Sequence, residues 1–416
     1  MSVSRRRVVV TGLGAVTPLG LTVPELWNGL LAGKSGIGPV TLYDSSQHEV
    51  KIAGEVKNFL PENYIEKREA RRLDRFSQLA VAAAREAVSD SKLDFSKEDT
   101  ARCGVLIGTG IGGITEIEEQ KERLMTKGPS KVSPFLIPKL MANAASAHVS
   151  ILYHLRGPNY CIVTACAAGA NSLGAALRTI QYGDADIMVA GGSEAAVTSL
   201  GMAGFANMGA LSKNTRDPQT ASRPFDKDRD GFVLGEGAGV VVLEELEHAL
   251  KRDARIYAEF TGYGLSGDGH HITAPCEDGD GGIRAMTGAP KDANLRPDDI
   301  DYINAHGTST PFNDKIETLA IKKALGDRAK KIPVSSTKSM TGHTLGAAGG
   351  VEFVVMCMSV AEDKVHQTLN YTTPDPDCDL DYVPGSARVH KVRNALSNSL
   401  GFGGHNATLI ASKLKL

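Results

Sequence analysis

The sequence lacks the features that mark secreted, metal-binding and membrane-spanning chains. It has six cysteines at irregular spacings and no Cys-x-x-Cys pair, which argues against a disulfide framework and a zinc knuckle. Gly, Asn or a charged residue interrupts each apolar run before the ~18 residues that span a bilayer, so we expect no signal peptide and no membrane helix. These absences fit a reducing location, either cytoplasmic or an organelle matrix reached by a removed transit peptide.

The sequence also has little net charge. Its 46 Lys and Arg against 48 Asp and Glu give a formal charge of −2, which indicates neither a nucleic-acid-binding protein nor one that binds an anionic membrane. Basic side chains cluster between Lys67 and Arg75, in a stretch of helical character. A solvated helix face is the ordinary explanation of such a cluster.

Short β-branched segments alternate with glycine-rich turns and alanine-rich helical stretches. Such segments lie at residues 7–10, 103–107, 161–163, 187–190, 239–243 and 301–304. The alternation predicts an α/β fold, and the wholly apolar VVVTG and GVVVL predict strands buried on both faces. A new strand from Ile256 places a domain boundary near residue 252. Pro290 is expected to break a helix that would otherwise run from Gly282 to Ala293.

Two glycine-rich turns resemble nucleotide-binding loops but fail the test of context. The segment GLGAVTPLG at residues 12–20 opens like a dinucleotide fingerprint, yet Thr17 replaces the third glycine and Pro18 follows where the helix should be under way. The segment GTGIGG at residues 108–113 lacks the Lys-Ser/Thr pair of a P-loop. Both segments are therefore predicted to be structural turns.

Cys166 differs from the other cysteines in its surroundings. The sequence VTACAAGA places it between a short strand and the helical run from Asn171 to Tyr182. At such an elbow the positive end of the helix dipole is expected to lower the pKa of the thiol. Small neighbours leave room for an acyl group. We therefore predict a nucleophile at Cys166 and an inert thiol at Cys161.

Two histidines lie on loops rich in glycine and hydroxyl groups. His306 belongs to NAHGTST and His343 to KSMTGHTLGAAGG. They lack the HExxH or HxxxH spacing of a helical zinc site, which disfavours metal binding. A cysteine with two histidines and no evident triad carboxylate suits thioester transfer and decarboxylation, in which donors stabilise a developing enolate oxygen.

Five motifs resemble, in order and spacing, those of the β-ketoacyl-acyl-carrier-protein synthases. They are VTACAAGA at 163–170, RPFDKDRDGFVLGEGAG at 223–239, NAHGTST at 304–310, SSTKSMTGHTLGAAGG at 335–350 and NSLGFGGHNA at 398–407. The resemblance implies a thiolase-like α/β fold with five layers, α-β-α-β-α, built from two similar halves. Residues 1–252 would carry the nucleophile and residues 253–416 the histidines. It also implies a type II enzyme that elongates fatty acids by decarboxylative Claisen condensation with malonyl-acyl-carrier protein.

The resemblance implies roles for single residues as well. Cys166 would carry the acyl chain, while His306 and His343 would bind the malonyl thioester carbonyl and Lys338 would order this network. The amides of Cys166 and Phe402 would form an oxyanion hole, and Phe402 would act as a gate between flexible glycines. The remaining implied substrate contacts are Ile111 for the acyl pocket and Thr273, Thr308 and Thr310 for the phosphopantetheine arm.

The implied partner is the acidic acyl carrier protein, acyl- or malonyl-loaded, and the implied assembly is a homodimer. The basic cluster then becomes part of a docking surface with salt-sensitive binding. No cofactor is expected, although some relatives hold a structural Na⁺ or K⁺. The residues that match docking positions are Arg68, Arg71, Arg72, Lys131 and Lys213. Those that match cation positions are Asn304, Glu352, Ser397 and Asn398.

Several related functions share part of this pattern. A type I synthase and a polyketide ketosynthase would keep the same cysteine and histidines, and both stay open. A non-catalytic chain-length partner lacks the nucleophile, whereas Cys166 is present here. A thiolase uses a second cysteine near the C-terminus, and the GFGG loop has none. His405 follows that loop where many relatives carry Thr or Asn, which predicts altered movement or titration of the gate.

Overall fold

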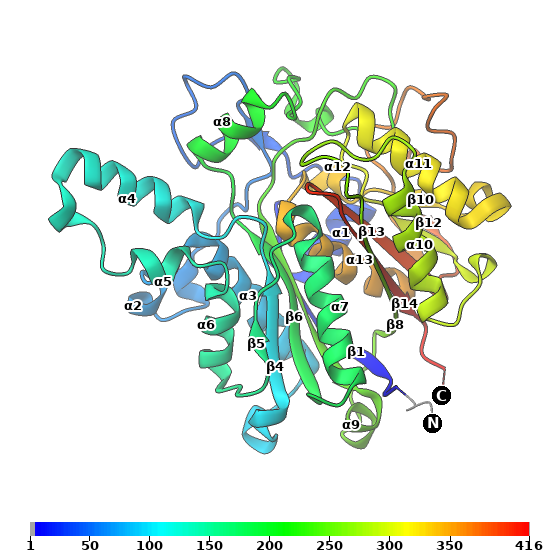
Figure 1. The fold of residues 1–416 in the computed structure, drawn as a ribbon, viewed down its shortest axis with the longest axis horizontal. Helices are drawn as coiled ribbons and strands as arrows, with labels where there is room; N and C mark the ends of the chain where they lie inside the picture. Colours follow the sequence, from blue (N-terminus) through cyan, green and yellow to red (C-terminus); the bar gives the residue numbers. More distant parts are fainter. Residues whose placement is uncertain (1–4, 416) are drawn as a thin grey trace.

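The computed structural model describes residues 5–415, and ten of its strands form one continuous sheet (Figure 1). Their order is β10-β9-β13-β14-β8-β1-β7-β6-β4-β5. In its middle, β1 and β8 pair only through Val9 with Glu259 and Val10 with Ala258, so the sheet consists of two parts. The strand bounds are β1 Val8–Val16, β4 Cys103–Gly108, β5 Asn159–Tyr160, β6 Ile187–Glu194, β7 Gly237–Glu245, β8 Ala258–Gly267, β9 Tyr302–Asn304, β10 Val334–Ser335, β13 Asn394–Gly401 and β14 His405–Ser412.

The two parts of the sheet have the same topology. In the first, β1, β7 and β6 pair antiparallel, and β6, β4 and β5 pair parallel. In the second, β8, β14 and β13 pair antiparallel, and β13, β9 and β10 pair parallel. Each part also uses its strands in the same order along the chain. The fold is therefore built from two similar halves, as the resemblance implied.

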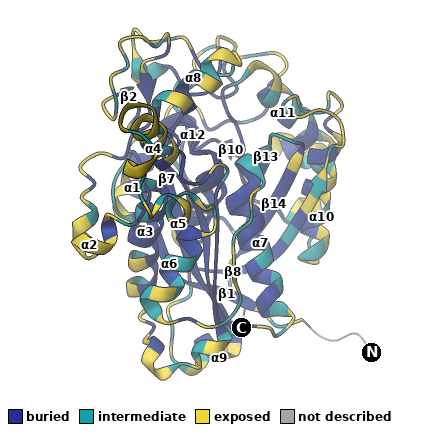
Figure 2. Cartoon of the chain, turned by 60° about the vertical axis from the view of Figure 1, so that its left-hand side comes forward, coloured by how far each residue is buried: buried dark blue, intermediate teal, exposed yellow. Residues whose placement is uncertain are grey.

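Helices complete five layers, α-β-α-β-α. Helices α3 and α6 cover the outer face of the first part, α10 and α11 cover the second, and α7 and α13 fill the space between them. Figure 2 shows the burial that results, with dark sheets and central helices and yellow outer surfaces. The helix bounds are α1 Val23–Leu31, α2 Lys67–Ala70, α3 Arg75–Ser91, α4 Ile114–Lys127, α5 Leu136–Leu140, α6 Ala144–Tyr153, α7 Ala168–Gln181, α8 Ser199–Asn207, α9 Leu246–Lys251, α10 Asp280–Asp292, α11 Pro311–Leu325, α12 Lys338–Thr341 and α13 Ala348–Glu362.

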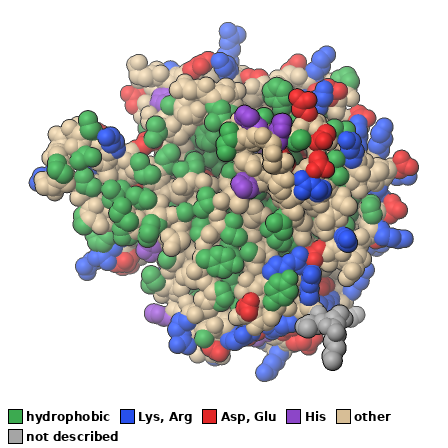
Figure 3. Space-filling view, in the orientation of Figure 1, with side chains coloured by type: hydrophobic (Ala, Val, Ile, Leu, Met, Phe, Trp, Pro, Cys, Tyr) green, Lys and Arg blue, Asp and Glu red, His purple; other side chains and the backbone are tan. Residues whose placement is uncertain are grey.

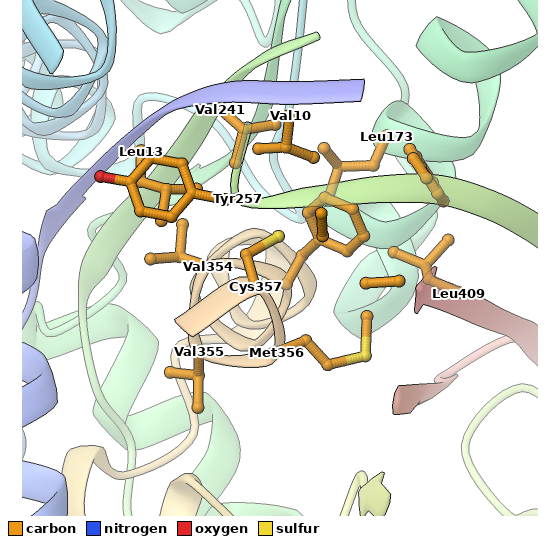
Figure 4. Close-up of a cluster of buried hydrophobic side chains, with 14 of the residues drawn as sticks. Val10, Leu13, Leu173, Val241, Tyr257, Val354, Val355, Met356, Cys357 and Leu409 are labelled. Atoms are coloured by element: carbon orange, nitrogen blue, oxygen red, sulfur yellow. The ribbon is translucent and has the colours of Figure 1, made fainter. Parts of the chain in front are cut away.

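Helix α13 is the centre of the largest hydrophobic core. Figure 4 shows Val354, Cys357 and Met356 of this helix packed among side chains of β1, β7, β14 and α7. The segment Leu345–Glu362 is long and apolar enough to cross a bilayer, with a mean hydropathy of 1.5, although the sequence predicted no such run. Because 89% of the segment is buried inside the protein, it is accounted for as a core helix.

Several local predictions can be compared with the structure. Every residue of β1 and β7 is buried, which confirms that these apolar strands are covered on both faces. The predicted break at Pro290 is wrong, because α10 continues to Asp292 and the proline removes only one amide donor in its last turn. The strand predicted at 161–163 is also wrong, since β5 ends at Tyr160. The boundary at residue 252 falls between α9 and β8, and it stays a prediction.

Candidate active site

Cys166 lies at a strained elbow before helix α7. Ala165 has a φ of +48°, which is unfavourable for a residue with a Cβ, and a short 3-10 turn then leads into the helix. The side-chain amide of Asn171 donates to the Thr164 hydroxyl at 2.8 Å and fixes the chain before the turn. The thiol of Cys166 is thus held in place, and the residue is only 6% exposed.

The thiol of Cys166 does not have the lowered pKa that its helix position predicted. Burial raises the pKa to about 11, and the backbone amide of Phe402, the ammonium of Lys338 and the amide of Cys166 itself oppose the rise. The prediction is wrong because desolvation of the buried thiolate is the largest influence on this pKa. Cys166 therefore rests as a thiol, and these same groups stabilise negative charge that develops on the sulfur during reaction.

His343 contacts the nucleophile directly. Its Nε2 lies 3.1 Å from Sγ of Cys166. The backbone N–H of Leu345 donates to Nδ1 at 3.3 Å, so Nδ1 carries no proton and Nε2 is the protonated nitrogen. Nε2–H therefore donates toward the sulfur. This geometry makes His343 a hydrogen-bond donor and excludes it as the base that removes the thiol proton.

His306 stands beside His343 at the end of β9. The two ring centroids are 5.3 Å apart and the rings are nearly perpendicular. Burial lowers the pKa of each histidine well below its usual value, and the nearby charge of Lys338 lowers both further. Both rings are therefore neutral at physiological pH. Two neutral imidazoles can share one substrate oxygen as donors without carrying charge into the cavity.

Lys338 forms a buried ion pair with Glu352 behind the histidines. The side chains of Lys338 and Glu352 are 2% and 1% exposed. Burial raises the pKa of Glu352 to about 7, and Lys338 opposes this rise. Lys338 of this pair supplies the positive charge that lowers the histidine pKa values further.

The residues matched to a cation site offer two free oxygens. Within the described part of the chain, Oε2 of Glu352 and Oδ1 of Asn304 are buried and have no hydrogen-bond partner. Ser397 pairs with Asn304 in register across β13 and β9. Oδ1 of Asn398 already accepts from Thr408 at 3.0 Å. The oxygens of Glu352, Asn304 and Ser397 therefore fit a hard monovalent cation. Among residues 5–415, no group of three or more His, Cys, Asp or Glu side chains could hold a metal ion.

A cavity of about 500 Å³ opens above the nucleophile. Its lining includes Cys166, both histidines and Phe402, together with the three predicted phosphopantetheine contacts Thr273, Thr308 and Thr310. The last two are joined by a hydrogen bond of 2.9 Å. Ile111 is absent from this lining and is 39% exposed on the surface, so its role in the acyl pocket stays a prediction.

Phe402 lies in the tight turn between β13 and β14. Gly403 and Gly404 have φ values of +82° and +71°, which favour glycine, so the turn requires both. The N–H of Gly403 donates to the carbonyl of Ile272 at 2.6 Å, which joins this turn to the loop that carries Thr273. Both loops border the cavity, so movement of one would alter the other.

The predicted docking residues fall into two places. Arg68, Arg71 and Arg72 lie on or next to α2, where the Arg72 guanidinium stacks 5.1 Å from the ring centroid of Phe135. This contact brings α2 beside the segment of Lys131. Lys213 lies apart from them. Its amide donates to Asp230, which lines the cavity, and its ammonium pairs with Glu49 at 2.8 Å.

Two buried carboxylates that the sequence analysis did not single out hold the catalytic loops. Glu317 of α11 accepts the amide hydrogens of His306 and Gly307, each at 2.7 Å. Glu194 at the end of β6 accepts the amide hydrogen of Gly346 at 3.1 Å. The only sequence signal for Glu194 is an acidic residue that closes an apolar strand.

The chain is similar to known proteins over nearly its whole length. The model of the β-ketoacyl synthase N-terminal domain matches residues 5–249, and that of the C-terminal domain matches residues 257–372. The 3-oxoacyl-[acyl-carrier-protein] synthase 2 of Synechocystis sp. is 54% identical over 412 residues, which cover 99% of each chain. The enzyme of the same name from Staphylococcus aureus is 52% identical over 410 residues, also 99% of each.

Solved structures agree with this similarity. A ketosynthase in complex with a type II polyketide acyl-carrier protein has a TM-score of 0.91 at 39% identity, and the match covers 99% of this chain and 100% of that one. The ishigamide ketosynthase/chain length factor has a TM-score of 0.93 at 38% identity with the same coverage. Together with the cysteine, the two histidines and the duplicated fold, these matches show that the chain belongs to the β-ketoacyl synthase family.

Proposed function

We propose that this protein elongates fatty acids by condensing an acyl group held on Cys166 with malonyl-acyl-carrier protein, which gives 3-oxoacyl-acyl-carrier protein and CO₂. One observation carries the proposal: a buried thiol lies 3.1 Å from Nε2–H of a neutral histidine, with a second neutral histidine beside it. Such a site suits thioester exchange followed by enolate formation. The relatives named above supply the substrate class.

In the first half-reaction the acyl group moves from the carrier thiol to Cys166. The sulfur attacks the thioester carbonyl, the amides of Cys166 and Phe402 receive the oxyanion, and the carrier leaves as a thiol with the proton from Cys166. Because burial raises the pKa of Cys166 to about 11, this proton is lost only during attack.

In the second half-reaction malonyl-carrier protein enters the same cavity. Nε2–H of His343 and the ring N–H of His306 bind its thioester carbonyl, so that loss of CO₂ leaves an enolate whose oxygen they stabilise. The enolate carbon attacks the acyl group on Cys166, a carbon–carbon bond forms and the sulfur is released to take up a proton. The low pKa values keep both imidazoles neutral donors throughout.

Intact-protein mass spectrometry tests this function. We expect the wild type to gain acyl mass from acyl-carrier proteins and to lose it, with a product two carbons longer, when malonyl-carrier protein is added. Cys166→Ala should gain none. Absence of acyl-enzyme for every chain length would refute the proposal and favour a non-catalytic chain-length partner.

Polyketide chain growth is the second candidate, because one of the solved structures described above is a ketosynthase with its type II polyketide acyl-carrier protein. The higher identity to synthase 2 enzymes favours fatty-acid synthesis. A product that accumulates repeated keto groups without intervening reduction, at rates above those for saturated acyl substrates, would favour the polyketide function. A type I synthase would be recognised by a preference for acyl chain length that differs from that of a type II synthase.

The acyl carrier protein is proposed to dock on the basic residues around α2. Reversing the charge of Arg71 and Arg72 should raise KM for carrier-bound substrate about tenfold and leave small thioester mimics unaffected. Arg296→Glu, an exposed arginine on the other half of the protein, is the matched control. An equal effect on both substrates would contradict docking at this place.

A homodimer is proposed through the face that carries α4, α5 and β5. Figure 3 shows hydrophobic side chains gathered over the projecting part of the molecule. Met125 of α4, Ile137 of α5 and Tyr160 of β5 are each more than 40% exposed. Among the strands that the structure describes, β5 pairs only with β4, which leaves a strand edge for a second copy. Light scattering should give a dimer that Ile137→Glu weakens and Val389→Glu, at an exposed site on β12 (Arg388–Val389), does not.

A structural Na⁺ or K⁺ is proposed on Asn304, Glu352 and Ser397, with Asn398 beside them. When bound it would neutralise the free oxygen of Glu352. Thermal unfolding in KCl, NaCl and choline chloride at equal ionic strength should show a higher midpoint with one of the two metal ions. Equal midpoints in all three salts would contradict the cation. A cytoplasmic location stays a prediction.

A further inference from the structure

The duplicated fold places a second elbow beside the one that carries Cys166. Before α7, Ala165 has a φ of +48°, and before α13, Leu345 has a φ of +46°. In each case a three-residue 3-10 turn begins at that residue and leads into the helix. Gly346 is therefore the counterpart of Cys166. Positive φ at two matching non-glycine positions marks a constrained backbone that the surroundings must hold.

The carboxylate of Glu194 fills the second elbow. Its Oε2 accepts the N–H of Gly110 at 2.6 Å and of Gly346 at 3.1 Å, and its Oε1 accepts the Thr109 hydroxyl at 2.8 Å and the N–H of Ile111 at 3.3 Å. Glu194 is completely buried. A Cβ on Gly346 would lie 2.8 Å from Oε2, so the glycine makes room for this carboxylate. Four donors on one buried carboxylate form a rigid anchor.

The anchored turn is the one that sets the proton position on His343. The N–H of Leu345 donates to Nδ1 of His343, and the next amide, that of Gly346, is held by Glu194. We propose that Glu194 is a positioning residue for His343: it holds the turn that keeps Nδ1 as an acceptor and Nε2–H directed into the cavity. This inference rests on the proposed function and deepens it.

The two half-reactions should respond differently to the loss of this anchor. Acylation of Cys166 depends chiefly on the oxyanion amides of the first elbow, those of Cys166 and Phe402, which Glu194 does not contact. His343 also donates toward the sulfur, but loss of Glu194 removes a negative charge that raises the pKa of the thiol, which offsets a weaker donor. Decarboxylation depends on Nε2–H of His343 as a donor to the malonyl carbonyl. Loss of Glu194 should therefore slow decarboxylation more than acylation.

Separate rate measurements of the two steps test the inference in the full-length protein. In Glu194→Ala we expect malonyl-carrier decarboxylation to slow about tenfold or more, and acylation by less than about threefold. In Glu194→Gln the amide oxygen can keep both Oε2 donors while its NH₂ donates to the Thr109 hydroxyl, so that the 3.3 Å contact from the N–H of Ile111 is lost. That variant should stay within about threefold of wild type in both steps.

Glu244→Ala is the matched control. Glu244 is another fully buried glutamate, at the far end of β7, held by Arg252, His248 and Thr11. Its loss should lower stability without separating the two rates.

Equal slowing of both steps in Glu194→Ala, as in the control, would overturn the inference and leave Glu194 a purely structural role. If Glu194→Ala does not fold, Glu194→Met takes its place, because it fills a similar space and offers no oxygen to the amide of Gly346. The same split is expected there, and its absence overturns the inference. Failure of the wild type to acylate or decarboxylate would instead refute the proposed function.

Discussion

Replacing Lys338 with Met should cost about 3 kcal/mol of unfolding free energy above neutral pH, because it strands the carboxylate of Glu352. Both side chains are almost fully buried, so water cannot solvate the charge that remains. Oε2 of Glu352 already lacks a hydrogen-bond partner. Loss of the ammonium therefore leaves neither oxygen with a donor among residues 5–415.

The cost should grow with pH. Burial raises the folded-state pKa of Glu352 to about 7. Its favourable contribution to the free energy of unfolding is therefore complete below the pKa of the unfolded state and is lost as pH rises through 7. Without Lys338 that pKa rises further. The variant should then keep losing about 1.4 kcal/mol per pH unit above pH 7, where the wild-type contribution is level. The difference between the proteins should thus be larger at about pH 8.5 than at about pH 6.

Urea unfolding at both pH values measures this difference. The double variant Lys338→Met, Glu352→Gln should recover part of the loss, because no buried charge remains. The control is Lys364→Met, whose partner Glu362 lies 3.0 Å away in a pair that is 41% and 37% exposed, and it should cost less than about 1 kcal/mol. A loss of unfolding free energy in Lys338→Met that is no greater than in Lys364→Met, or that does not depend on pH, would contradict a stranded carboxylate at Glu352.

Other positions give further tests. Gly346→Ala should lower the thermal midpoint sharply and abolish condensation, since its Cβ would lie 2.2 Å from the amide nitrogen of Gly110. Gly204→Ala, in an exposed part of α8 with nothing within 4 Å, should instead stabilise the protein by up to about 1 kcal/mol in the same assay. Because the pKa values of His306 and His343 lie well below the usual value, malonyl decarboxylation should not fall between about pH 8 and about pH 6.5; a decline there would contradict neutral histidines.

The sequence located the reacting side chains because each belongs to a local motif. Cys166 follows a β-branched segment and precedes a helix of small residues, and His306 and His343 lie on loops unsuited to a core. The structure brings all three together around one cavity. The prediction that the cysteine of one half meets the histidines of the other came from the family resemblance, because no periodicity in the chain shows that residues of the two halves meet.

The local sequence does not show which polar side chains are buried. The helix dipole at Cys166 is readable from sequence, whereas the desolvation that raises its pKa depends on segments far along the chain. The same holds for Glu194 and Glu317, which look like surface residues until the amides that they bind are known. The helix break at Pro290 was wrongly predicted because the loss of one backbone hydrogen bond costs little near the end of a helix.

The duplication explains why the site needs both halves. Each half supplies an elbow that leads into a central helix, and the two helices, α7 and α13, pack against one another. Close packing requires small residues: a Cβ on Gly169 would lie 2.8 Å from the carbonyl oxygen of Gly346. The first elbow carries the thiol of Cys166. The second elbow is filled by the carboxylate of Glu194, and His343 precedes it. One half therefore provides the nucleophile and the other the donor, and neither half alone contains a complete site.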